Sequence, residues 1–326
     1  MFTKAFRVFF VSLAILAGSL SAFSFDRSGI LDMHYGPNLS LTAMGNSPII
    51  WGEWLPQLIT AVDFSWIEPL GESLPYGEGV NVNAAFLRMQ AGLELSPFYE
   101  NFSFGMGLRP FSINPQIGLN FVYSNLVYFD SNIEMAMAGS SSAKQKGSIA
   151  QNWNTKYIFD NIYGDEDIDF DFSQSFTMGA NLDYRSKTGL MVGVYFNFIL
   201  VDITTGFDGK SYDYQRNMPV FSRDYLLELC LFGRYPLSQT LIFLDEIDCY
   251  KSGVSKSGNT IHKESLHYGK VLSGLEYAWG NRNRHRFTLT PGFFMRGKSR
   301  FYDGNIGQQF IIQLQYSCQF GLFSYF

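Results

Sequence analysis

The chain has 326 residues, of which 17% are aromatic and 16% charged, with a formal net charge of −5. The charged fraction is below the roughly 25% of a typical soluble domain, yet the mean hydropathy is only −0.02. The N-terminal segment aside, no apolar run reaches the about 18 residues of a membrane-spanning helix, so a helical membrane protein is excluded. The net negative charge argues against a nucleic-acid partner.

Residues 1–24 have the parts of a secretory signal peptide. Lys4 and Arg7 give a positively charged start, and residues 8–20 form an apolar core. Ala22 and Ser24 then supply the small residues of a cleavage site. The core is shorter than the about 20 residues that a helix needs to span a membrane. We therefore predict that residues 1–24 are removed and that the rest of the chain is exported.

Residues 25–56 are the part with the weakest pattern. Leu39, Leu41 and Ala43 alternate with polar residues, but the alternation is brief. We expect no strand of membrane length here. The segment is interpreted as a periplasmic lead-in, a plug folded inward, or one extra hairpin.

From Leu58 onward the chain alternates between apolar and polar residues in short segments separated by turns. Phe176, Met178 and Ala180, for example, alternate with Thr177 and Gly179. Side chains of a strand alternate between its two faces, so each segment is predicted to be a strand with one apolar and one polar face.

The last segment gives the clearest pattern. Its apolar positions are Phe310, Ile312, Leu314, Tyr316, Cys318, Phe320 and Leu322, and the sequence ends on Phe326. This pattern resembles the terminal strand of bacterial outer-membrane β-barrels, which end on an aromatic residue, usually Phe. Ser324 departs from the pattern, because an aromatic or aliphatic residue is common there.

The resemblance implies a location in the outer membrane of a Gram-negative-type bacterium, with the lipids of that membrane and the barrel-assembly machinery as partners. It also implies that the terminal strand is the signal for assembly. The residues that match this signal are Tyr316, Phe320, Leu322 and Phe326.

The predicted fold is all-β: residues 25–326 form a single transmembrane antiparallel up-and-down β-barrel of about twelve strands, with ten or fourteen as alternatives. Short turns at 185–189 and 236–238 alternate with long loops at 204–222 and 252–263. Outer-membrane barrels have short periplasmic turns and longer extracellular loops, so all the short turns are expected on the periplasmic side. Residues 139–167, which have no periodicity, are predicted to be a long extracellular loop.

The polar faces are predicted to line the lumen, and they carry charges of both signs. These charges line a conduction path or pair across the interior and plug it. Many of the other inward positions are glycines, which favours open space, unless they merely relieve strand curvature. The candidate lumen-lining residues are Arg88, Glu94, Arg109, Asp183, Glu228, Arg234 and Arg296.

These features favour a passive channel or transporter for small solutes that is not an enzyme and needs no cofactor. The alternative is a non-conducting barrel with a structural role or a loop that binds a partner. A third interpretation is a phospholipase-like hydrolase at the rim, using His262, Ser265 and His267, although the phospholipase motif is absent. No metal site is expected, because the acidic run at 165–171 lacks the glycine and final glutamate of an EF-hand.

Overall fold

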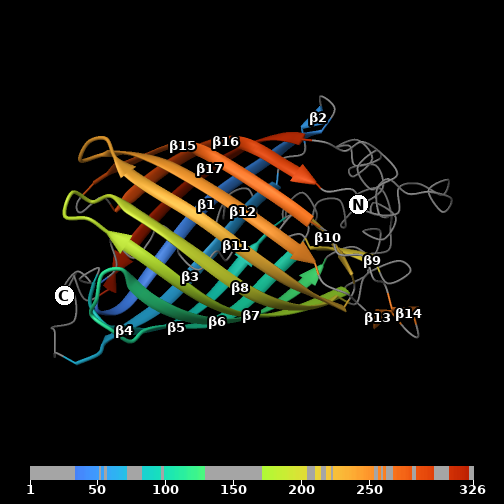
Figure 1. Cartoon of the computed structure of the whole chain (residues 1–326), viewed down its shortest axis with the longest axis horizontal. Coiled ribbons are helices and arrows are strands. Elements are labelled where there is room, and N and C mark those ends of the chain that lie inside the picture. Colours follow the sequence, from blue (N-terminus) through green and yellow to red (C-terminus); the bar gives the residue numbers. More distant parts are fainter. Residues whose placement is uncertain are drawn as a thin grey trace, which may run out of the picture.

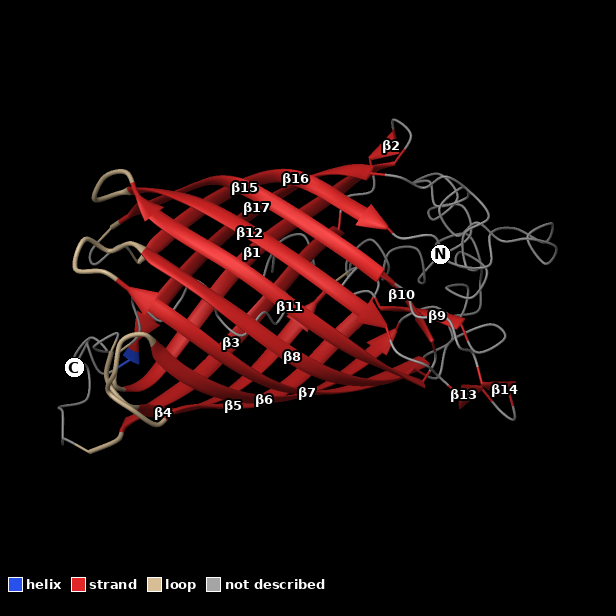
Figure 2. Ribbon diagram, in the orientation of Figure 1, coloured by secondary structure: helices blue, strands red, loops and turns tan. Residues whose placement is uncertain are grey.

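The computed structural model describes residues 34–50, 53–54, 57–71, 83–96, 99–128, 171–203, 210–213, 218–221, 223–252, 256–257, 260–261, 267–280, 284–296 and 308–322. They form a closed barrel of twelve antiparallel strands, as Figures 1 and 2 show. The predicted all-β, twelve-stranded barrel is therefore confirmed. The predicted signal peptide, the loop at 139–167, the acidic run at 165–170 and Phe326 lie outside the described residues. Within the described residues no helix is long and apolar enough to cross a membrane.

The wall is a meander in which each strand pairs with the next along the chain, and the last strand closes on the first. Its strands are β1 (Gly36–Ile50), β3 (Gln57–Pro69), β4 (Phe86–Leu95), β5 (Tyr99–Arg109), β6 (Gln116–Tyr128), β7 (Asp171–Arg185), β8 (Met191–Ile203), β11 (Arg223–Pro236), β12 (Leu241–Ser252), β15 (His267–Trp279), β16 (His285–Arg296) and β17 (Gln308–Gly321). The short strands outside the wall are β2 (Glu53–Trp54), β9 (Lys210–Asp213), β10 (Met218–Phe221), β13 (Lys256–Ser257) and β14 (Thr260–Ile261).

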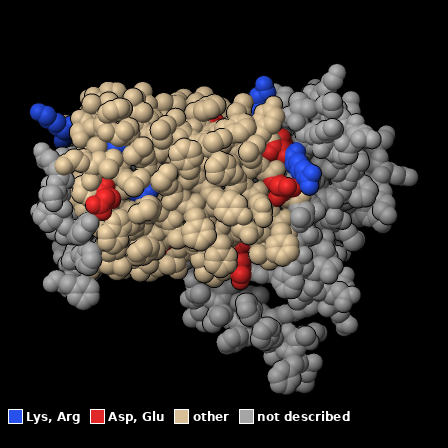
Figure 3. Space-filling view, turned by 90° about the horizontal axis from the view of Figure 1, so that it is seen from below, with Lys and Arg blue, Asp and Glu red and all other residues tan. Residues whose placement is uncertain are grey.

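The two faces of the wall differ as the alternation predicts. Outward-facing apolar side chains are exposed, with Phe104 of β5 at 61%, whereas inward-facing polar side chains such as Asn101 and Arg109 are at most 2% exposed. On the face seen in Figure 3 the barrel is mostly uncharged, and charged side chains gather towards its two ends. This distribution is the reverse of a soluble domain and suits a wall surrounded by lipid.

The two ends of the barrel differ in their connections. At the short-turn end, which is on the left in Figure 1, the strands are joined by residues 110–115, 186–190, 237–240 and 280–284. At the opposite, long-loop end they are joined by 129–170, 204–222, 253–266 and 297–307. The alternation predicted for the C-terminal half of the chain is present.

The N-terminal half departs from this alternation. Residues 96–98 connect β4 to β5 at the long-loop end, although the expectation placed every short turn at the other end. The Ser96 N–H, directly after the ten-residue strand β4, donates to the carbonyl oxygen of Tyr99 (2.8 Å), which holds the ends of β4 and β5 together. The longer connection at 70–85 lies at the short-turn end.

Strand β1 corrects the interpretation of residues 25–56. The expectation that this segment contains no strand of membrane length is wrong, because β1 has fifteen residues and pairs with both β17 and β3. Pro48 cannot donate to a ladder, and a proline within a run argues against a strand in the sequence. Pairing on both sides of β1 overrides this weak local preference.

The three cysteines are free thiols. Cys230 on β11 pairs with Asp248, and Cys249 on β12 pairs with Leu229, so the two cysteines are one residue out of register. Their side chains lie on opposite faces of the wall, because Cys230 is fully buried towards the lumen and Cys249 is exposed.

Candidate functional site

The lumen near the short-turn end contains a buried ion pair between Arg109 and Asp183. Arg109 ends β5, and Asp183 lies on β7, the next strand but one. The Nη2 atom of Arg109 is 2.6 Å from Oδ2 of Asp183, and both side chains are at most 2% exposed. Arg109 Nη1 donates to Oε1 of Gln116 (2.8 Å), and Asn181 Nδ2 donates to Oδ2 of Asp183 (2.8 Å). These additional bonds compensate the desolvation of both charges.

A second buried cluster centres on Glu276 of β15. Its Oε1 atom is 2.6 Å from Nη2 of Arg234 on β11 and 3.3 Å from Nη1 of Arg286 on β16. All three side chains are at most 6% exposed. One carboxylate thus holds two guanidinium groups, one on the adjacent strand β16 and one on β11, beyond the intervening strand β12.

Five arginines line the lumen at this end, and we call them the arginine belt. Each lies within the three residues of its strand that are nearest the short-turn end, and each is at most 6% exposed. Asp183 and Glu276 are the third and fourth residues from this end of their strands. The members of the belt are Arg88, Arg109, Arg185, Arg234 and Arg286. Among the described lumen residues, this end therefore has five guanidinium groups for two carboxylates.

The centre and the long-loop half of the lumen have the opposite charge. The Nζ atom of Lys270 on β15 lies 3.0 Å from Oε1 of Glu246 and 2.7 Å from Oδ2 of Asp248, both on β12. Carboxylates therefore outnumber ammonium and guanidinium groups among the described lumen residues of this part. We call these carboxylates the acidic group, and its members are Asp63, Glu94, Asp224, Glu228, Glu246 and Asp248.

A row of hydrogen bonds follows the wall from β6 to Glu228 of the acidic group. Asn120 of β6 donates from Nδ2 to Oδ1 of Asn197 on β8 (3.4 Å), and Asn197 donates from Nδ2 to Oε2 of Glu228 on β11 (2.7 Å). The Tyr250 hydroxyl of β12 donates to Oε1 of the same glutamate (2.9 Å). The bonds run sideways from strand to strand, so these side chains lie along the wall.

The inward glycines make room for such side chains. A Cβ atom built on Gly179 would lie 2.0 Å from Oδ1 of Asn197 and 2.4 Å from Oδ1 of Asn120, the side chains of its two cross-strand neighbours. Gln90 covers Gly105, Asn181 covers Gly118, and Phe232 and Asp183 cover Gly193 in the same way. The space above each glycine is therefore filled by a neighbour, which neither of the two interpretations of the glycines anticipated.

Six of the seven residues expected to line the lumen have buried, inward-facing side chains: Arg88, Glu94, Arg109, Asp183, Glu228 and Arg234. Glu94 accepts hydrogen bonds from the Tyr99 hydroxyl and from Asn101 Nδ2. Arg296 is described by its backbone alone, which pairs with Tyr268. His262 and Ser265 lie outside the described residues, as does the side chain of His267. No cluster of three metal-ligating side chains occurs within the described part of the chain.

Several residues of the site were missed by the sequence analysis, which placed Arg185 in a turn and did not name Arg286. Arg185 is two residues from the inward Asp183, and Arg286 is two residues from the inward Thr288. Extending the period of two to the strand ends would have found both arginines. Glu276 stands between the outward Leu275 and Tyr277, so the same signal assigns it to the lumen.

Comparison with known proteins shows which fold the chain has, but it does not place the chain in a family. No model of a known protein family matches the sequence, and no curated protein is similar to it. An outer-membrane channel from Pseudomonas putida F1 is 10% identical, with a TM-score of 0.52 over 90% of this chain and 99% of that one. The chain has the fold of the bacterial outer-membrane β-barrels.

Two other solved structures of bacterial outer-membrane β-barrels have lower TM-scores. The translocator domain of the autotransporter NalP from Neisseria meningitidis is 12% identical, with a TM-score of 0.40 over 90% of this chain and 91% of that one. The β-domain of the Bordetella autotransporter BrkA is 8% identical, with a TM-score of 0.40 over 88% of this chain and 100% of that one.

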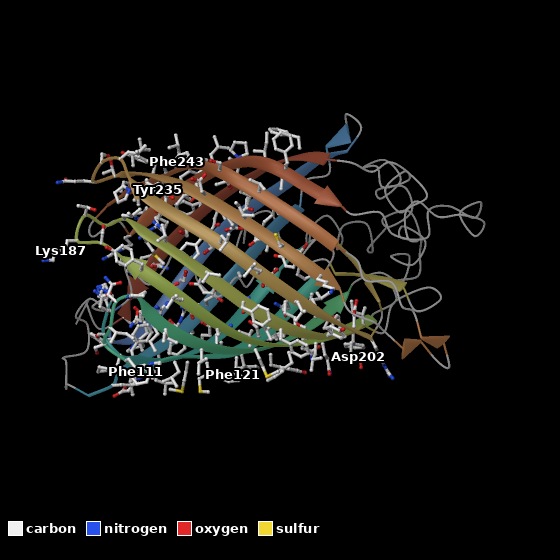
Figure 4. The ribbon with its side chains drawn as sticks, viewed as in Figure 1. Phe111, Phe121, Lys187, Asp202, Tyr235 and Phe243 are labelled. Carbon is white, nitrogen blue, oxygen red and sulfur yellow. The ribbon has the colours of Figure 1, made fainter. Side chains whose placement is uncertain are left out.

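The outward face has the aromatic side chains that outer-membrane barrels place at the membrane interface. Near the short-turn end Trp279 stacks on His285, with ring centroids 5.5 Å apart, and the Tyr316 hydroxyl lies 2.9 Å from Nδ1 of His285. The rings of Tyr235 and Phe243 pack together with their centroids 6.1 Å apart, near the short-turn end in Figure 4, and Tyr235 is exposed.

The residues of the proposed assembly signal belong to this same region of the barrel. Tyr316 and Phe320 face outward from β17. The guanidinium carbon of Arg284 lies over the ring of Phe320, 5.5 Å from its centroid. Leu322 directly follows the strand.

Proposed function

We propose that this protein is a passive channel for small solutes in the bacterial outer membrane, with no catalytic step and no cofactor. The observation that supports the proposal most strongly is the sideways arrangement of the lumen side chains. Asn120, Asn197 and Glu228 bond to one another along the wall, and Gly179 leaves room for two of them. Side chains that lie along the wall leave the barrel axis to the solute.

The buried ion pairs support the same proposal. Arg109 and Asp183 are separated by one intervening strand, as are Arg234 and Glu276. Neighbouring strands are about 4.8 Å apart, so each pair covers about 10 Å of wall. An eight-stranded barrel is filled by its side chains and barrels of sixteen to eighteen strands enclose an open channel, so twelve strands suit a narrow pore.

A non-conducting barrel is the second candidate, and one observation favours it. Most described polar side chains of the lumen are buried, as for Asn101 at 0% and Asp248 at 0%. A filled interior would bury them in this way. Conductance separates the two candidates, because a filled interior passes no ions.

The first prediction is that Gly179→Leu roughly halves the single-channel conductance of the full-length protein in planar lipid bilayers. The leucine occupies the space of the Asn120 and Asn197 side chains, so apolar bulk and displaced amides enter the lumen. Ala180→Leu is the matched control, because Ala180 is the next residue of β7 and its side chain is exposed on the outward face. The control variant should conduct like the wild-type protein.

Two results would contradict the channel. Closed bilayers at all voltages with correctly folded wild-type protein would favour the non-conducting barrel instead. Equal conductance of the Gly179→Leu and wild-type proteins would show that ions do not pass this part of the wall. Folding is checked by the different migration of heated and unheated samples on a denaturing gel.

A further prediction concerns assembly. Deleting Phe326 should reduce the amount of folded protein in the outer membrane by about tenfold at 37 °C. The deletion removes the aromatic residue of the proposed assembly signal, and chains that are not assembled are degraded. The measurement is membrane fractionation with heat-modifiable migration. Phe326→Tyr, which keeps an aromatic terminus, should assemble normally. Normal assembly of the shortened chain would contradict the proposed signal.

A further inference from the structure

Within the arginine belt, Arg185 differs in its hydrogen bonding. Arg185 is the last residue of β7, and its backbone is fixed by the side chain of Asn114. Asn114 Nδ2 donates to the Arg185 carbonyl oxygen (2.6 Å), and Asn114 Oδ1 accepts from the Arg185 N–H (3.1 Å). The Arg185 side chain is 6% exposed. Within the described part of the chain, its Nε and Nη1 atoms have no hydrogen-bond partner. A buried guanidinium with unused donors is costly unless an acceptor binds there.

Charges of both signs surround the guanidinium of Arg185. Arg109 and Arg234 lie close enough to act on the guanidinium of Arg185 unfavourably, while Asp183 acts on it favourably. Asp183 already forms its ion pair with Arg109 at 2.6 Å. The described carboxylates of this end therefore do not balance its positive charge.

We propose that the arginine belt, centred on Arg185, is a binding site for oxyanions inside the lumen. The proposal rests on the proposed channel function for its biological meaning, and it makes small solutes that carry a phosphate, sulfate or carboxylate group the substrate class. The planar guanidinium offers parallel N–H donors that match two oxygens of such a group. A bound oxyanion supplies the missing acceptors and reduces the repulsion between Arg185, Arg109 and Arg234.

The acidic group makes the arginine belt easier for an anion to reach from the short-turn end than from the long-loop end. Glu228, Glu246 and Asp248 lie between the belt and the long-loop end of the barrel. An anion that arrives from the short-turn end reaches the belt without passing them. Phosphate added on that side of the bilayer should therefore reduce the chloride current more than the same concentration added on the other side.

The direct test is calorimetric titration of inorganic phosphate into the folded full-length protein in detergent. Arg185→Gln should weaken phosphate binding about tenfold or more, because a charge-assisted pair of hydrogen bonds is lost. Arg185→Lys keeps the charge and loses the second parallel donor, so it should weaken binding by about threefold. Lys187→Gln is the matched control, because Lys187 is an exposed cation in the adjacent turn, and it should bind phosphate like the wild-type protein.

The outcomes separate the site from the channel. Absence of phosphate binding to the wild-type protein, or equal affinity of wild-type and Arg185→Gln proteins, would overturn the binding site whatever the conductance. Phosphate binding that depends on Arg185 in a protein that never conducts would support the site and overturn the channel. If Arg185→Gln does not fold, the comparison of Arg185→Lys with Lys187→Gln decides, and equal affinities of these two variants would overturn the proposal.

Discussion

Replacing Asp183 by Asn should lower the free energy of unfolding by about 3–5 kcal/mol. The substitution leaves the Arg109 guanidinium, which is 2% exposed, without its carboxylate. It also removes the one described carboxylate that acts favourably on the neighbouring Arg185. Unfolding in urea, followed by tryptophan fluorescence of the protein in lipid vesicles, measures the change.

Two matched variants show whether burial is the cause. Asp202 and Arg223 also form an ion pair, at 3.3 Å, but their side chains are 59% and 78% exposed. Asp202→Asn should therefore cost no more than about 1 kcal/mol. The double variant Arg109→Met with Asp183→Leu removes both buried charges and should regain most of the loss. Equal effects of Asp183→Asn and Asp202→Asn would show that the buried pair contributes no special stability.

The strands and their faces could be predicted because each face of the wall has one environment. The outward face is apolar, as a wall facing lipid requires, so apolar residues repeat with a period of two along β7 and β8, and the sequence shows this directly. Strand β1 lacks the signal at Gly45, Asn46 and Pro48, and its pairing with β17 and β3 compensates. Such pairing depends on residues far apart in the chain, so a local pattern does not reveal it.

The charged residues of the site could be assigned to the lumen, but their partners could not. Arg109 and Asp183 meet across the intervening strand β6, where Gln116 pairs with Asp183. This register is a property of the whole sheet, and a shift of one residue would turn Asp183 to the outside. Arg185 was assigned to a turn because a turn and the last residue of a strand share a polar composition.

The glycines show a second limit of the sequence pattern. An inward glycine such as Gly118 appears as empty space when each strand is considered alone. The neighbouring strand places Asn181 over it, so close that a Cβ atom would lie 2.3 Å from Oδ1. Small residues on one strand and long polar residues on the next are therefore complementary, and the complementarity appears only once the register is known.

The last prediction tests the membrane itself. Replacing Phe121 by Arg should lower the free energy of unfolding by about 2–4 kcal/mol in lipid vesicles, because a charge in the middle of the lipid-facing wall loses its hydration. Phe121 is the sixth of the thirteen residues of β6, its side chain is 38% exposed, and it points outward in Figure 4.

Phe111→Arg is the control for the same substitution outside the hydrocarbon layer. Phe111 is 55% exposed and belongs to the connection at 110–115, at the short-turn end of the same side of the barrel in Figure 4. Arginine near the interface costs about 0–1 kcal/mol, so the two variants should differ by at least about 1 kcal/mol. In a water-soluble barrel both phenylalanines would face solvent, and both arginine variants would be close to neutral. A difference that depends on depth therefore requires a lipid layer around the middle of the wall, with its edge between Phe121 and Phe111.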